Sequence, residues 1–127
     1  MMSHSDRLES THFSLEQLAR GVYACIHKPG GGAYSNAGIV DLGDRTVVVD
    51  AFQTLAAGRD LRRAAEGLFE RPGEMVVLTH AHSDHWIGAS AFDAGTTLLA
   101  SPATDRAWAK QGPEILEDYR SPAMWED

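Results

Sequence analysis

Two short apolar runs, one on each side of a segment with helical periodicity, constrain the fold of this chain most. Residues 46–49 and 75–79 are β-branched or apolar almost throughout, as buried strands are. Between them, a helix is predicted over about residues 55–70, ended by Pro72-Gly73. Its apolar face is set by spacings of three, four and seven residues and consists of Leu61, Ala65, Leu68 and Phe69. This strand–helix–strand order predicts an α/β sheet packed by helices.

The flanking sequence adds further elements to this unit. Strands are predicted over residues 21–26 and 36–42, with a turn at Gly43-Asp44 before residues 46–49. After the central unit we expect a short helix from Trp86 to Phe92, a strand over 96–100, and a helix from Ser101-Pro102 to about Gln111, where Gly112-Pro113 breaks it. Residues 1–12 are polar and are predicted to be disordered, so the domain is expected to span residues 13–127.

Composition excludes several classes of function. The chain has 127 residues, which fits one small domain, and a net charge of −7, which disfavours nucleic acid and anionic membranes as partners. Cys25 is the only cysteine, so a disulfide within the chain and a thiolate zinc cage are both excluded. No apolar run is long enough to span a membrane, and the first residues do not resemble a signal peptide. We therefore expect a cytoplasmic protein that acts on a small molecule.

The segment from His80 to His85 carries the chemistry. It reads His80-Ala81-His82-Ser83-Asp84-His85 and directly follows the predicted strand over 75–79. Residues two apart in an extended chain point the same way, so His80 and His82 are able to grip one ion. Imidazole and carboxylate donors suit zinc, and also iron or manganese. An accidental surface cluster is the alternative, but a buried strand before the segment and an apolar helix after it argue against that. The remaining histidines lack such a pattern and are predicted to be surface residues: His4, His12 and His27.

This segment resembles the His-x-His-x-Asp-His motif of the metallo-β-lactamase superfamily. The resemblance extends over about residues 20–110. It includes Ser35–Val40, the strand Val47–Asp50, the strand Met75–His80 that leads into the motif, Gly88 and Phe92. It implies the N-terminal half of a four-layer αββα sandwich, with a mixed sheet flanked by helices.

The resemblance also implies roles for five residues. His80 and His82 would bind a first metal ion, and Asp84 and His85 a second. Asp84 would also orient the attacking water or handle its proton. Asp50 would lie behind the site and hold the metal-binding loop. The implied protein is a zinc-dependent hydrolase that cleaves an ester, thioester, lactone or lactam bond; an iron-dependent oxidoreductase associated with flavin also occurs in the superfamily.

The chain departs from the superfamily after the motif. The superfamily completes its site with a third histidine on the first ion, a bridging aspartate and a late histidine on the second. No histidine follows His85 here, and the remaining aspartates lie in no recognisable bridging context: Asp93, Asp105, Asp118 and Asp127. A catalytic zinc normally has three protein ligands, and His80 and His82 supply two. Truncation of a longer enzyme is the preferred explanation. The alternative is a non-catalytic, metal-binding half-domain, which needs a separate chain or a second copy of itself to complete the site.

Overall fold

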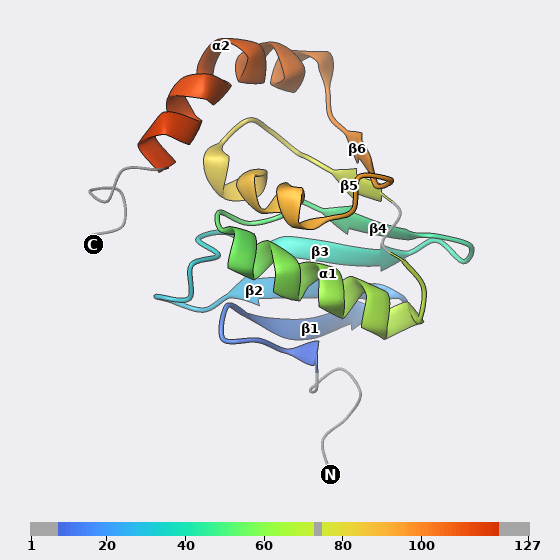
Figure 1. Cartoon of the computed structure of the whole chain (residues 1–127). Helices are drawn as coiled ribbons and strands as arrows, with labels where there is room; N and C mark the ends of the chain where they lie inside the picture. The colour runs from blue at the N-terminus through green and yellow to red at the C-terminus, as the bar shows by residue number, and fades with distance from the viewer. Residues whose placement is uncertain (1–7, 73–74, 120–127) are drawn as a thin grey trace.

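A six-stranded sheet forms the frame of the molecule (Figure 1). The computed structural model describes residues 8–72 and 75–119. The strands lie side by side in chain order: β1 (Phe13–Ala19), β2 (Val22–His27), β3 (Ala37–Asp41), β4 (Thr46–Val49), β5 (Met75–Val77) and β6 (Thr97–Leu99). The first four pair antiparallel, and β4, β5 and β6 run parallel, so the predicted mixed sheet is confirmed.

Helix α1 (Leu55–Phe69) connects β4 to β5 and packs on one face of the sheet. Thr54 caps its first turn, with its hydroxyl accepting a hydrogen bond from the Ala57 N–H at 3.2 Å. Glu70 ends it in the left-handed conformation, at φ 53°. Leu61 and Ala65 are fully buried, while Leu68 and Phe69 pack against the core and stay partly exposed. The predicted helix and its apolar face are therefore confirmed.

Strand β1 was not predicted. Only Phe13 of its seven residues is fully buried, and Glu16 to Ala19 are exposed, because β1 is the edge of the sheet. Pairing with β2 holds it in place, with Leu15 opposite Cys25. An edge strand of this kind carries too little apolar alternation to stand out in a sequence.

The predicted end of the last helix at Gly112-Pro113 is wrong, because α2 (Pro102–Tyr119) continues through Pro113. A proline ring clashes with the Cβ of the preceding residue in a helix, and Gly112 has none. The proline also leaves the carbonyl of Ala109 without its helical partner, but Ala109 is exposed and water can reach it. The short helix predicted over 86–92 is a 3₁₀ helix, η3 (Ile87–Ala91), and a further 3₁₀ turn, η2 (Ser83–His85), precedes it.

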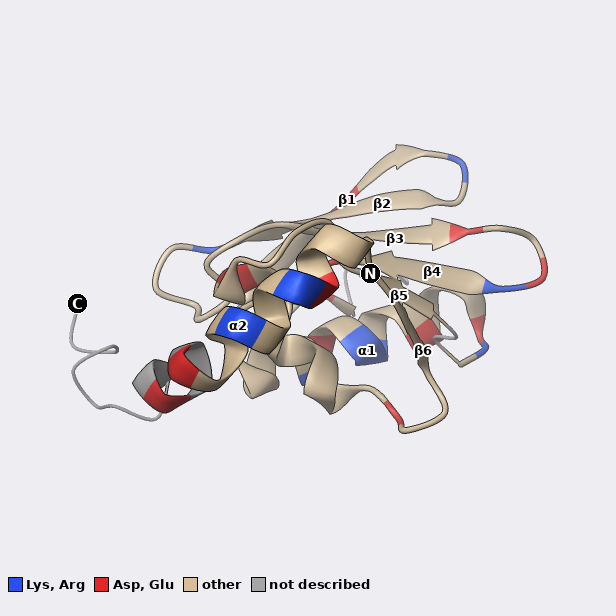
Figure 2. Ribbon diagram, turned by 90° about the horizontal axis from the view of Figure 1, so that it is seen from above, with Lys and Arg blue, Asp and Glu red and all other residues tan. Residues whose placement is uncertain are grey.

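The opposite face of the sheet is also apolar. Because side chains alternate along a strand, Ile39 and Val48 point toward α1, while Val40 and Val49 point away from it. Within residues 8–72 and 75–119 no helix packs on that second face (Figures 1 and 2). Figure 2 shows charged residues on the helices and the turns, with few on the strands. We call this second surface the open face, defined by Leu18, Val22, Ala24, Val40 and Val49.

The N-terminal prediction falls partly outside the described residues. Residues 1–7, including His4, lie there, whereas Leu8 packs against the core and Glu9 accepts a hydrogen bond from the Leu15 N–H at 3.0 Å. No helix in the described part of the chain has the length and hydrophobicity needed to cross a membrane.

Candidate metal centre

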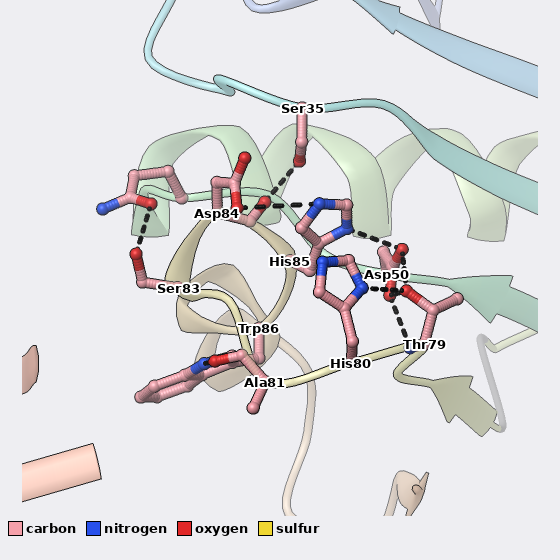
Figure 3. Close-up of polar contacts among 10 residues, drawn as sticks. Ser35, Asp50, Thr79, His80, Ala81, Ser83, Asp84, His85 and Trp86 are labelled. Carbon is pink, nitrogen blue, oxygen red and sulfur yellow. Dashed lines mark hydrogen bonds and ion pairs between the residues drawn. The ribbon is translucent and has the colours of Figure 1, made fainter. Parts of the chain in front are cut away.

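The histidine motif lies in the loop that follows the carboxyl end of β5 (Figure 3). The adjacent parallel strand β4 ends beside it, and Asp50 is the first residue after β4. Backbone hydrogen bonds join the two segments, from the Asp50 N–H to the Val77 carbonyl and from the Ala51 N–H to the His85 carbonyl, both 2.8 Å. Parallel pairing of β4 and β5 thus brings together residues 27 and 34 positions apart.

Asp50 is the centre of the hydrogen-bond network behind the motif. It is 5% exposed, and its carboxylate accepts hydrogen bonds from the backbone N–H and the hydroxyl of Thr79, at 2.8 Å and 2.9 Å. Its second oxygen lies 2.7 Å from Nδ1 of His85. A carboxylate only accepts, so Nδ1 of His85 carries the proton of this hydrogen bond, and in the neutral ring Nε2 carries the lone pair. Asp50 therefore fixes both the orientation and the tautomer of His85.

The structure brings three of the four histidine and aspartate side chains of the motif, His80, Asp84 and His85, close together. The rings of His80 and His85 lie 4.1 Å apart between centroids, and Nε2 of His85 lies 3.6 Å from a carboxylate oxygen of Asp84. Nδ1 of His80 lies 2.8 Å from the Thr79 hydroxyl. His82 is more exposed and touches the His80 ring edge-on, at 4.7 Å between centroids.

The donor set fits a transition metal chemically. In the part of the chain that the structure describes, no three histidine, cysteine, aspartate or glutamate side chains are arranged to hold one ion. The contact of His85 with Asp50 is nevertheless one that metal-binding histidines commonly make, because such a histidine donates its other ring N–H to a carboxylate. Three imidazoles and one carboxylate are donors that zinc, iron and manganese accept.

Cys25 takes no part in this chemistry. It is fully buried beneath α1, and burial raises the pKa of its thiol to about 12. A thiol in that state is neither a nucleophile nor a metal ligand at neutral pH.

Glycines hold the motif against α1. A Cβ on Gly88 would lie 2.0 Å from the Ala51 carbonyl oxygen, and a Cβ on Gly58 would lie 2.2 Å from the Gly88 carbonyl oxygen. Both distances are far below van der Waals contact, so α1, η3 and the segment after β4 approach this closely only through glycine. The glycine expected after the motif from resemblance therefore has a physical reason here.

Sequence reasoning missed the contacts of two polar residues at the site, Ser35 and Gln53. Ser35 is 7% exposed and its hydroxyl donates to the Asp84 carbonyl; Gln53 is 5% exposed and its side-chain oxygen accepts from the Ser83 hydroxyl at 3.1 Å. Serine and glutamine are common residues without a recognisable spacing, so no sequence signal pointed to them. Their burial is the signal, and it exists only in the structure.

Comparisons with known proteins agree with this geometry. The family model of the metallo-beta-lactamase superfamily matches residues 30–116. Among solved structures, a metallo-β-lactamase from Erythrobacter litoralis is 26% identical, with a TM-score of 0.69, over 82% of this chain and 48% of that one. One from Hirschia baltica is 25% identical, with a TM-score of 0.65, over 79% of this chain and 48% of that one.

A metallo-β-lactamase from Pseudomonas aeruginosa, solved in a mono-zinc form, shares the fold at 22% identity, with a TM-score of 0.65 over 79% of this chain and 46% of that one. Comparison with curated proteins finds no match. The chain thus spans about half the length of the solved structures that it matches, as expected for one half of the sandwich. The family match covers more than two thirds of the 127 residues, and the chain belongs to the metallo-beta-lactamase superfamily.

Proposed function

We propose that this chain contributes the first half of the metal centre of a zinc-dependent hydrolase. Membership of the superfamily and the metallo-β-lactamases among its structural relatives support a metallo-hydrolase. The observation that carries the proposal is the contact between Asp50 and His85, which turns Nε2 of His85 toward Asp84. A buried carboxylate that orients an imidazole in this way is the usual support of a metal ligand.

The proposed roles are those that the resemblance to the superfamily implies for these residues. His80 and His82 would hold a first ion, and Asp84 and His85 a second, so the chain would bind one or two ions; zinc is preferred, with iron and manganese as alternatives. When bound, zinc would supply a water whose pKa is lowered to about 7, the nucleophile of the reaction. Asp84, half-buried beside His85, would orient that water or accept its proton.

The proposed substrate is a small molecule with an ester, thioester, lactone or lactam bond. All four have an electrophilic carbonyl carbon that activated water attacks. The net charge of −7 disfavours polyanionic substrates such as nucleic acids. The cytoplasmic location stays a prediction from the sequence.

Elemental analysis of His82→Ala tests the ligand assignment. The variant is expected to lose the ion held by His80 and His82, because one imidazole alone binds zinc weakly. His27→Ala is the control, since His27 is exposed on β2 and contacts Asn36 instead of the motif. Zinc content in His82→Ala equal to that of the parent chain would contradict the assignment.

A non-catalytic half-domain is the second candidate. The open face favours it, because an apolar sheet surface of this kind is normally covered by another layer. In this alternative the chain needs a second chain or a second copy to complete the site. Two ions per chain with turnover of a chromogenic ester would favour the enzyme; less than one ion and no turnover would favour the half-domain.

A further inference from the structure

We propose that Gln53 is a positioning residue for the metal centre, and that it acts by clamping the turn η2 through Ser83. The inference rests on the proposed function, since it concerns how the chain holds Asp84 and His85 as metal ligands. Gln53 itself would touch neither metal nor substrate.

Two contacts define the clamp. Gln53 lies between β4 and α1, and its backbone N–H donates to the Ala33 carbonyl at 3.1 Å. Its side-chain oxygen accepts from the Ser83 hydroxyl, also at 3.1 Å. One residue thereby ties the first residue of η2 to the segment before β3. At 5% exposure Gln53 is shielded from water, so losing the Ser83 partner would leave a polar group poorly satisfied.

Ser35 contacts the same turn at the next residue, Asp84. Its hydroxyl donates to the backbone carbonyl of Asp84, as Figure 3 shows. Ser35 lies two residues after Ala33, which Gln53 holds. On the other side of the loop, the indole N–H of Trp86 donates to the Ala81 carbonyl at 2.8 Å. The turn is therefore held from both sides by side chains.

The turn needs such support because its own backbone bonds are few. η2 has three residues, and its hydrogen bonds run from the His85 N–H to the His82 carbonyl at 3.0 Å and from the Trp86 N–H to the Ser83 carbonyl at 3.3 Å. A 3₁₀ turn this short is weakly stable alone. Asp50 fixes the ring of His85, while the clamp fixes the backbone from which Asp84 projects.

The experiment measures zinc affinity of the full 127-residue chain by competition with a chromophoric chelator. Ser83→Ala and Gln53→Leu are each expected to lower zinc affinity about 10- to 100-fold, the usual loss when a supporting partner of a ligand is removed. The double variant is expected to lose no more than either single variant, because both remove one interaction. Ser83→Thr keeps the hydroxyl and is expected to restore affinity. Ser90→Ala, which removes a hydroxyl bonded to the Ile87 carbonyl in η3, is the control and is expected to bind as the parent does.

Additive losses in the double variant, or parental affinity in both single variants, would overturn the clamp. Amide hydrogen exchange of residues 83–86 in the metal-free chain provides the second measurement. Ser83→Ala is expected to speed exchange of the His85 and Trp86 amides, and Ser90→Ala to leave it unchanged. If the parent chain bound no zinc, the proposed function would fail while the exchange result would still decide the clamp. Unchanged exchange of the His85 and Trp86 amides in Ser83→Ala would refute the clamp.

Discussion

The two faces of the sheet are built from the same kinds of residue but differ in what covers them. On the face beneath α1, Ile39, Val48 and Val76 have no exposed surface. On the open face, Val40 and Val49 are half-buried and Leu18 is 63% exposed. In the described part of the chain, the face beneath α1 forms a buried core, and we call it the finished face. The open face is an apolar surface.

The support of the histidine motif lies where these two faces meet. Asp50 belongs to both surroundings, because it holds His85 and also lines the groove on the open face. A layer that covered the open face would therefore also contact Asp50, the residue that holds His85. The contrast teaches that, within the described residues, the histidine motif is supported from the face that α1 covers, while the other face leaves the groove beside Asp50 uncovered.

The largest expected effect comes from replacing one leucine on each side of the sheet by alanine. Leu61 on α1 has no exposed surface, so Leu61→Ala should lower the free energy of unfolding by about 2–5 kcal/mol. Leu18→Ala on the open face should change it by less than about 0.5 kcal/mol. Urea denaturation of both variants at two protein concentrations measures this. A Leu18→Ala loss that grows with concentration would show that two copies cover the open face, and equal losses in both variants would break the comparison.

The finished face was largely predictable from the sequence. Residues 46–49 are confirmed as β4, and α1 ends within one residue of its predicted end, because β-branched runs and helical spacing are local signals. The place of the motif after a strand was predictable for the same reason. Local pattern thus determined the frame that holds the ligands.

Apart from Asp50, whose place the resemblance implied, the supports of the site were not predictable, because they depend on contacts between distant residues. Ser35 and Asp84 are 49 positions apart, and Gln53 and Ser83 are 30 apart. His12 was predicted to be a surface residue, yet its Nδ1 contacts the Gly31 carbonyl and its Nε2 lies 3.8 Å from Asp60. Such pairings need the fold itself, since no spacing in the sequence relates their members.

An intermediate effect is expected for the glycines of α1. In a helix interior alanine is more stable than glycine by about 1 kcal/mol, so helix propensity alone predicts that Gly58→Ala and Gly67→Ala both stabilise the chain. A Cβ at Gly58 meets the Gly88 backbone, whereas a Cβ at Gly67 meets the flexible Leu8 side chain, 2.8 Å away. Gly58→Ala should therefore cost about 1–3 kcal/mol and Gly67→Ala little or nothing, as measured by denaturant unfolding. Stabilisation by Gly58→Ala would show that η3 is not pressed against α1 as described.

The smallest effect is expected at Asp41, which ties the end of α1 to the finished face. The Gly43 N–H, at 2.7 Å, and the Arg71 guanidinium lower the pKa of the Asp41 carboxyl below its usual value. A carboxyl with a lowered folded-state pKa adds stability above its unfolded pKa of about 3.9, and loses that contribution as the pH falls through the folded value. Asp41→Asn should therefore be less stable than the parent at pH 7, and the difference should shrink below about pH 4.

Asp44→Asn, in the same turn but 75% exposed, is the matched control and should track the parent at every pH. Thermal unfolding across this pH range measures both, and a constant difference for Asp41→Asn would mean that the carboxylate charge does not join α1 to the sheet.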